Sequence, residues 1–272
     1  MVFAIALIGA ASAAPPQRIV SLIPAVTEML FAIGAGPRLI GVSSYDRHPP
    51  EVDTRTRVGA LLDPDLERIL SLRPDLVAIY ETQTDLRTQL TRAGIPVFEY
   101  RFAIIDDIYA TLRALGRRLE LGDEAEREVA KLQRSLEDVR GRVAGRPRPR
   151  TLLVFGREPG AIRSVQASGG YGFLDELLQL AGGTNVFADQ VRPLVQASTE
   201  TILASAPEVI VELRYDRAMT PAEIEEALGS WQALPGVPAV RSGRVYLLSG
   251  DGLVVPGPRI ADTAARLADV LH

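Results

Sequence analysis

The side chains of this 272-residue chain that are best suited to binding stand where predicted strands end. Five of them follow or end such a strand: Tyr45, Tyr80, Phe155, Arg157 and Asp251. Ligands of parallel sheets bind beyond the carboxyl ends of the strands, so these residues are expected to meet in one cleft. Aromatic faces with a few polar groups suit a large flat ligand. Taken singly, each tyrosine could instead be a half-buried packing residue with its hydroxyl in water.

Two glutamates occupy the same place in an internal repeat. Residues 67–77 align without a gap with residues 200–210, and Glu67 and Glu200 each stand in the first turn of a predicted helix. A carboxylate in that place complements the helix dipole by about 0.3–1 kcal/mol, which would be reason enough for its presence. A matched pair of exposed acids, one in each half, also suits a partner that presents a matched pair of arginines.

The chain offers little material for catalysis. It has no cysteine and only two histidines, His48 and His272, which excludes thiolate nucleophiles and leaves almost nothing for a Ser-His-Asp triad. The net charge of −4 gives no basic footprint for nucleic acid. The glycine-rich stretch 168–172 could cradle a phosphate, but it lacks a P-loop lysine and is interpreted as the turn that enters a helix. Conventional hydrolytic chemistry is therefore disfavoured, and we assign no catalytic residue, no metal site and no cofactor to the chain.

Helix and strand patterns alternate in both halves, which predicts two similar α/β lobes of parallel strands with flanking helices. Between them, apolar residues recur at helical spacings of three and four: Val129, Leu132, Leu136, Val139 and Val143. This region predicts roughly 35 residues of rigid helix with a kink near Gly116 or Gly122. The expected division is an N-terminal lobe at 17–105, a connecting helix at 106–146 and a C-terminal lobe at 147–272. An ordinary pair of surface helices at the end of one domain is the alternative.

Residues 1–16 have the form of a secretory signal. An apolar run at 2–10 is followed by small residues and a cleavage site after Ala13, without the positive charge that usually precedes the run. A buried first strand is the alternative. No other apolar run is long enough to span a bilayer, so we expect no membrane insertion and a soluble, exported protein.

Four stretches after Pro16 have the form of family motifs. They are Arg18-Ile19-Val20-Ser21-Leu22 with Pro24, Thr27 and Glu28; Gly41-Val42-Ser43-Ser44-Tyr45 with Pro49-Pro50; Leu66-Glu67-Arg68-Ile69 with Arg73-Pro74-Asp75-Leu76-Val77; and Leu174-Asp175-Glu176-Leu177 with Gly182-Gly183 and Asn185-Val186-Phe187. Together they resemble the periplasmic binding proteins of the cobalamin and ferric-siderophore type. The resemblance implies a monomer whose two lobes, joined by one rigid helix, close only slightly on the ligand and deliver it to an ABC importer. It also implies that Glu67 and Glu200 dock on the permease dimer of that importer.

Within this family, the Ser43-Ser44-Tyr45 and Pro49-Pro50 sequences are most similar to vitamin B12 binders, in which the tyrosine stacks on the corrin. Tyr80 stands where those proteins have a tryptophan, and Leu61 and Gly252 replace two further aromatics. The implied ligand contacts are Tyr45, Leu61, Tyr80, Phe155, Arg157, Asp251 and Arg259. The less aromatic cleft leaves a different corrinoid, haem or a ferric chelate open. A two-lobed enzyme that uses a nucleotide-linked sugar, and a scavenger whose acids are only surface charge, are the alternatives from other classes.

Overall fold

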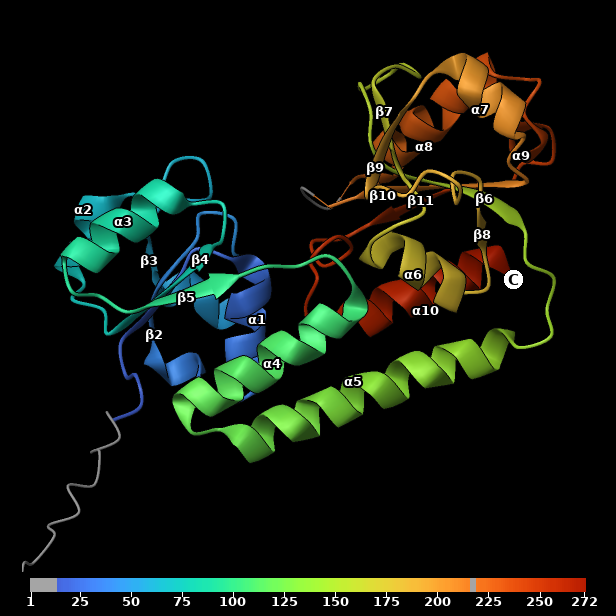
Figure 1. Ribbon diagram of the computed structural model, residues 1–272. Coiled ribbons are helices and arrows are strands. Elements are labelled where there is room, and N and C mark those ends of the chain that lie inside the picture. The colour runs from blue at the N-terminus through green and yellow to red at the C-terminus, as the bar shows by residue number, and fades with distance from the viewer. Residues whose placement is uncertain (1–13, 216–218) are drawn as a thin grey trace, which may run out of the picture.

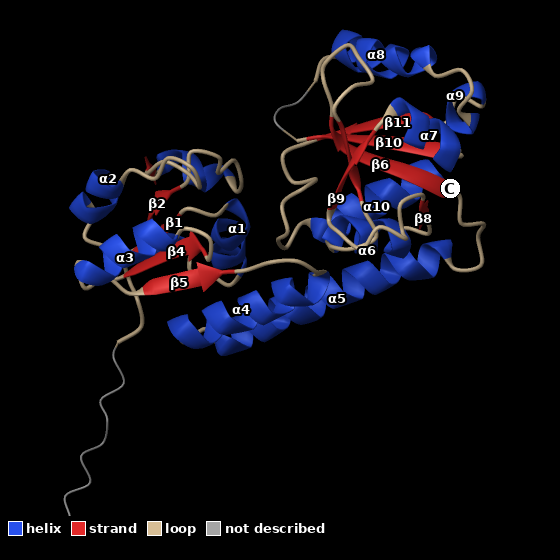
Figure 2. Ribbon diagram, turned by 45° about the horizontal axis from the view of Figure 1, so that its top comes forward, coloured by secondary structure: helices blue, strands red, loops and turns tan. Residues whose placement is uncertain are grey.

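The structure is a computed structural model that describes residues 14–215 and 219–272. It has two α/β lobes side by side, with one long helix running along both of them (Figures 1 and 2). The α/β fold class predicted from the sequence is confirmed. The predicted signal cleavage after Ala13 falls outside the described residues.

The N-terminal lobe is built on a five-stranded parallel sheet with the order β3-β2-β1-β4-β5. The strands are β1 (Ile19–Ser21), β2 (Leu39–Val42), β3 (Thr56–Arg57), β4 (Leu76–Tyr80) and β5 (Val97–Tyr100). The helices are α1 (Pro24–Ala32), α2 (Leu66–Ser71) and α3 (Thr84–Arg92), with short 3-10 turns at Gly36–Arg38 and Pro50–Thr54. Strand β4 is an unbroken apolar run, as expected of a central parallel strand that is covered on both faces.

Helix α1 begins earlier than its sequence suggests. Thr27 looks like a capping residue, but the helix starts at Pro24 and Thr27 is buried inside it. Proline is well suited to the first position of a helix, because it has the right backbone angle and its missing N–H would have had no partner there.

The C-terminal lobe has a six-stranded sheet with the order β11-β10-β6-β7-β9, and β8 pairs with β6. Its strands are β6 (Arg150–Gly156), β7 (Val165–Ser168), β8 (Thr184–Asn185), β9 (Leu194–Ala197), β10 (Val209–Arg214) and β11 (Val245–Ser249). Its helices are α6 (Phe173–Leu180), α7 (Thr199–Ser205), α8 (Pro221–Gly229), α9 (Pro238–Arg241) and α10 (Ile260–Leu271), with a 3-10 turn at Ser230–Ala233. A capping box of Thr220 and Glu223 begins α8.

The prediction of parallel strands throughout is wrong at one edge of this second sheet. Strand β7 runs antiparallel to both β6 and β9. The connection from β6 to β7 covers only residues 157–164, and a parallel return needs a crossover of about a dozen residues or more. Strand β9 is four residues long and was not recognised in the sequence.

The connecting region is a pair of helices, of which only the second joins the lobes. Helix α4 (Ile105–Leu119) and helix α5 (Gly122–Val143) lie side by side, and the chain reverses at Glu120, whose φ of 58° is left-handed. A Cβ atom on Gly116 would lie 2.5 Å from that of Ala125, so glycine is what lets the two helices approach. The kink predicted near Gly116 or Gly122 is therefore a full reversal, and the rigid connector is α5, about 33 Å long at 1.5 Å per residue.

One apolar core runs through both lobes by way of α5. The stripe from Val129 to Val143 is buried, as predicted, in a cluster that also holds side chains of α1 and α4 from the first lobe and of α6 and α10 from the second. Two smaller clusters lie under the outer helices of the two sheets. The lobes thus share their core, which restricts how far they can move apart. The division into lobes at 17–105 and 147–272 stays a prediction. The pair of helices between them begins at Ile105 and ends at Val143, close to the predicted connector of 106–146.

Shortening a buried side chain of α5 should destabilise the whole molecule. Leu132 is 2% exposed, so we expect Leu132→Ala to lower the free energy of unfolding by about 2–5 kcal/mol through lost burial and a cavity. Chemical denaturation followed by circular dichroism measures this change. Gln133→Ala on the exposed face of the same helix is the control and should change stability by less than about 0.5 kcal/mol. A small effect at Leu132 would contradict a shared core.

Candidate functional site

A cavity of about 300 Å³ lies between the lobes. The N-terminal lobe contributes Tyr80 and Tyr100, which end β4 and β5, together with Phe102 and the start of α1; the C-terminal lobe contributes residues 254–256. In Figure 1 this C-terminal segment, drawn in red, reaches across to α1. The cavity therefore sits beyond the carboxyl ends of the strands, where the alternation of strands and helices placed it.

Four aromatic rings form a continuous row along this cavity. Tyr80 meets Tyr100 edge-on at 5.9 Å, Tyr100 stacks on Phe102 at 6.2 Å, and Phe102 meets Phe173 edge-on at 5.1 Å. Phe173 is the first residue of α6, so the row crosses from one lobe to the other. Burial raises the pKa of both tyrosines, so their hydroxyls stay neutral. The row offers apolar ring surface with two neutral hydroxyls.

An ion pair links the lobes beside this row. The Arg259 guanidinium donates to both carboxylate oxygens of Glu28 in α1, from Nη2 to Oε1 at 2.6 Å and from Nε to Oε2 at 2.9 Å. Its third nitrogen, Nη1, donates to Asp251 at 2.9 Å. Partial burial acts to raise the pKa of Asp251. The hydrogen bond from Arg259 outweighs this effect and, with a smaller contribution from His48, holds the pKa below its usual value. A second link is the Tyr100 hydroxyl, which donates to the carbonyl oxygen of Pro256 at 3.4 Å.

The structure thus brings the predicted contacts Asp251 and Arg259 together. They form a hydrogen bond with each other. The carboxylate of Asp251 keeps 40% of its surface in solvent, whereas Arg259 keeps 22%, so the acid is the more accessible of the two. A Cβ atom on Gly252 would come within 2.8 Å of the Arg259 guanidinium, so a larger residue at this position would require Arg259 to shift.

Three other predicted contacts lie at or near the ends of N-lobe strands or in the shared core. Tyr45 follows β2 and is 69% exposed, so its ring is free to meet a ligand. Leu61 is 40% exposed, and its carbonyl accepts a bond from Gln83, which in turn holds the backbone of Tyr80. Phe155 is half-buried and packs against the shared core.

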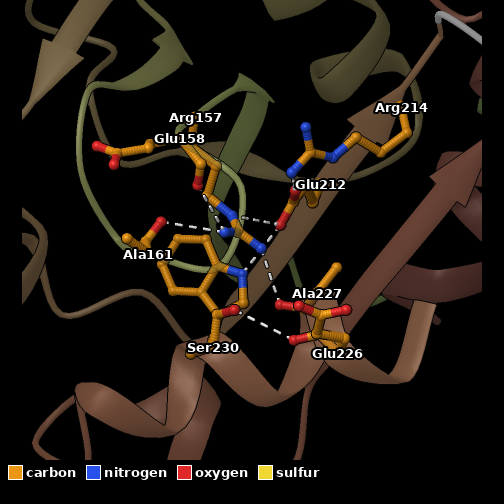
Figure 3. A network of polar contacts seen from close by, with 9 residues as sticks. Arg157, Glu158, Ala161, Glu212, Arg214, Glu226, Ala227 and Ser230 are labelled. Atoms are coloured by element: carbon orange, nitrogen blue, oxygen red, sulfur yellow. Dashed lines mark hydrogen bonds and ion pairs between the residues drawn. The ribbon is translucent and has the colours of Figure 1, made fainter. Parts of the chain in front are cut away.

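Arg157 has a different place from the one predicted. Its side chain is fully buried, and its Nε donates to Glu212 at 3.0 Å while Nη2 donates to the carbonyl oxygen of Ala227 at 2.8 Å (Figure 3). Nη1 donates to the backbone, and the guanidinium lies 5.8 Å from the ring centre of Trp231. This contradicts the prediction that Arg157 bonds to a ligand. The sequence does contain a signal for this pairing. Glu212 is the one acid in the mostly apolar strand β10, and a buried carboxylate requires a cationic partner.

Sequence reasoning missed three residues of the cleft. Tyr100 ends β5 and would have been found by the same strand-end rule as Tyr80. Glu28 is the one charged residue in the apolar helix α1 and is 5% exposed, a pattern that calls for a buried cation nearby. Phe102 follows β5 and gives no signal of its own.

Asp46 is a buried acid beneath Tyr45. It is 0% exposed, and neither carboxylate oxygen has a hydrogen-bond partner within residues 14–215 and 219–272. Burial raises its pKa from 3.8 to about 7, against the lowering effects of Thr27, the backbone at Ser43 and Arg57, and the nearby Glu28 raises it further. The carboxyl is therefore partly protonated near neutral pH.

The two candidate docking acids are both exposed and stand on matching helices. Asp65 caps α2 and Ser198 caps α7, each by accepting the backbone N–H three residues further on. A hydrogen bond from Ser198 lowers the pKa of Glu200, so this acid is charged at neutral pH. Figures 1 and 2 show α2 and α7 on the side of the molecule away from α5, one on each lobe.

The remaining features indicate no second chemistry. The backbone N–H groups of Gly169, Gly170 and Phe173 donate to carbonyl oxygens of the chain itself, so this loop has the role of a helix-entry turn. Residues 14–215 and 219–272 contain no cluster of His, Asp or Glu suited to hold a metal ion. Nor does any helix in this part of the chain have the length and apolar character needed to cross a membrane.

Two α/β lobes with a shared core, an aromatic cleft and an exposed acid on each lobe define a ligand-binding protein of the two-lobed class. A family model described as periplasmic binding protein matches residues 19–251, and this chain belongs to that family. The chain is 30% identical over 269 residues to a vitamin B12-binding protein of Pectobacterium carotovorum, covering 97% of this chain and 92% of that one. The family predicted from the motifs is thereby confirmed.

Two solved structures share the fold and a quarter or more of the residues. The periplasmic vitamin B12-binding protein of Vibrio cholerae is 27% identical with a TM-score of 0.77, covering 94% of this chain and 97% of that one. A periplasmic heme-binding protein of Pseudomonas aeruginosa is also 27% identical, with a TM-score of 0.80 and coverage of 94% and 92%. These names describe binding and not catalysis, in agreement with the prediction from the composition.

The buried carboxyl of Asp46 should make stability depend on pH. Because its folded pKa of about 7 lies above 3.8, the folded chain keeps a proton that the unfolded chain releases as the pH rises through this window. The stability contributed by this carboxyl is greatest below about pH 4 and falls up to about pH 7. Asp46→Asn removes the titration, so the free energy of unfolding of the variant, minus that of the unaltered protein, should increase by about 2–4 kcal/mol from pH 4 to pH 8.

Denaturant unfolding at a series of pH values measures this difference. Asp53→Asn is the control, because Asp53 is 75% exposed in its pair with Arg57 and should give a difference that changes little with pH. A difference for Asp46→Asn that is the same at pH 4 and pH 8 would show that Asp46 titrates normally.

Proposed function

We propose that this protein captures a corrinoid of the vitamin B12 type in the cleft between its lobes and delivers it to an ABC importer from the periplasm. The observation that carries the proposal is the row of aromatic rings along the cavity between the lobes, in a chain that matches a vitamin B12-binding protein over 97% of its length. Tyr45, exposed after strand β2, offers a further ring surface. Stacking on ring faces is the interaction that a flat macrocycle offers.

The size of the cavity suggests how such a ligand is held. The cavity of about 300 Å³ is open to solvent, so a flat ring can enter it by one edge between Tyr80 and residues 254–256. The rest of the ring then lies against Tyr45 and Leu61, which are exposed for this purpose. Asp251 is accessible to a polar side group of the ligand, and Arg259 holds that acid in position.

A haem or a ferric siderophore is the second candidate. It is favoured by the match to a heme-binding protein, whose TM-score of 0.80 is similar to the 0.77 of the vitamin B12-binding protein of Vibrio cholerae. An enzyme that uses a nucleotide-linked sugar is not supported, because the amides of the glycine-rich loop are already bonded.

Replacing Tyr45 should distinguish the contribution of its ring from that of its hydroxyl to ligand binding. We expect Tyr45→Ala to weaken binding of cyanocobalamin or cobinamide about tenfold or more, because the ring surface is lost, and Tyr45→Phe to keep most of the affinity. Calorimetry and the shift of the visible spectrum measure both. If the unaltered protein binds haemin or a ferric chelate and neither corrinoid, the ligand is the second candidate.

The docking acids should be needed for uptake and not for binding. Glu67→Ala with Glu200→Ala removes two exposed charges that do not line the cavity, so ligand affinity should be unchanged while importer-dependent uptake is lost. Uptake of labelled ligand by cells that carry only the variant measures this. Glu137→Ala with Glu124→Ala, on the exposed face of α5, is the matched control. Unaltered uptake by the first variant would favour a scavenger whose acids are only surface charge.

A further inference from the structure

The helices that carry the two acids are built and fixed in the same way. Each ends in a left-handed residue at the same place in the repeat, Arg73 with φ 49° and Ala206 with φ 43°. A proline and a strand follow in both cases. A non-glycine residue rarely adopts this conformation, so its occurrence at both places shows that the ends of both helices are tightly specified.

The contacts that hold these helices to their sheets are also repeated. Arg18 donates to the carbonyl oxygen of Leu72 at the end of α2, and Arg150 donates to that of Ser205 at the end of α7, at 2.7 Å. Asp75 accepts the backbone N–H of Arg18 at 2.8 Å, and Glu208 accepts that of Arg150 at 2.9 Å. Each helix is thus clamped to the first strand of its lobe, and the residues on its outer face have a fixed position.

Each helix carries a partly exposed leucine on its outer face. Ile69 and Ile202 are fully buried on the inner face, whereas the next residues, Leu70 and Leu203, are 37% and 42% exposed. Residues three apart on a helix are neighbours, so each leucine lies beside the acid of its own helix. A single exposed leucine needs no explanation. Two of them at the same place in a repeat, each next to an exposed acid, form a pattern.

We propose that Leu70 and Leu203 dock on the importer together with the acids, so that the permease dimer meets two identical acid–leucine pairs and not two isolated charges. This rests on the proposed function. The partner surface then carries two arginines, each beside an apolar recess that receives a leucine. An apolar contact that excludes water from the rim of a carboxylate–guanidinium pair strengthens the pair, because exposed charges attract each other only weakly in water.

The charges around the pairs are consistent with this partner. Glu67 has no ion-pair partner in the part of the chain that the structure describes, and Arg68 beside it is drawn to Asp65 at 3.4 Å. In the second lobe the residue after Glu200 is the uncharged Thr201. Both acids are therefore available to a cation from outside, with a leucine on the same surface.

Binding of the labelled protein to right-side-out membrane vesicles of the native host tests the proposal. We expect Leu70→Ala with Leu203→Ala to weaken saturable binding about tenfold, and each single substitution about threefold, with ligand affinity and thermal stability unchanged. Leu194→Ala is the matched control, because Leu194 is 41% exposed in the same lobe as Leu203 but lies on β9 outside the repeat. It should bind as the unaltered protein does.

The outcomes distinguish this inference from the proposed function. If the leucine pair can be removed without effect while Glu67→Ala with Glu200→Ala abolishes binding, the acids dock alone and the inference is overturned. If the acid variant binds as well as the unaltered protein, or if the unaltered protein shows no saturable binding, delivery to an importer is itself wrong. An equal loss for Leu194→Ala, or a change in self-association measured by sedimentation, would show that the leucines are not a specific docking contact.

Discussion

The apolar stripe of α5 is the constraint on which the rest of the structure depends. Val129, Leu132 and Leu136 are buried in a core that belongs to both lobes, so separating the lobes would expose this stripe to water. The cleft therefore exists before any ligand arrives, and its width is set by the packing of one helix. Closure of the lobes on a ligand can only be small, since a close-packed core does not deform continuously.

The ion pair of Glu28 and Arg259 is a second connection between the lobes, separate from the packing of α5. It is bidentate and largely buried, and such pairs contribute orientation more reliably than net stability, because both charges lose their water. The third nitrogen of Arg259 holds Asp251, which precedes the cavity-lining segment 254–256, in place. Asp46, buried close to Glu28, adds a proton-dependent charge to the same region. Ring surface and a positioned charge are thus both pre-organised between the lobes.

The two lobes are alike where they would meet a partner and unlike where they meet the ligand. Helices α2 and α7 repeat their caps, their clamps, their acids and their exposed leucines. In the cleft, by contrast, the first lobe supplies the rings of Tyr80 and Tyr100, and the second supplies the segment that carries Asp251 and Arg259. Arg157, which holds the carboxyl end of β6 to β10 through Glu212, has no such counterpart in the first lobe. A repeated outer face suits a symmetric partner, whereas an asymmetric cleft suits an asymmetric ligand.

By itself the sequence determined the two α/β halves, the apolar stripe of α5, the helix-proline-strand repeat with Glu67 and Glu200, and the strand ends at Tyr45 and Tyr80, because each of these is a local pattern of spacing and residue type. Only the tertiary structure decided the rest. The reversal at Glu120 depends on how closely Gly116 lets two helices pack, and the antiparallel β7 depends on a short connection between strands. Whether a charged residue faces a ligand or a buried partner depends on atoms more than 50 residues away, as for Arg157 with Glu212 and for Arg259 with Glu28. Pairing between distant charges leaves no periodic trace in the chain, so the partners become known only when the fold brings them together.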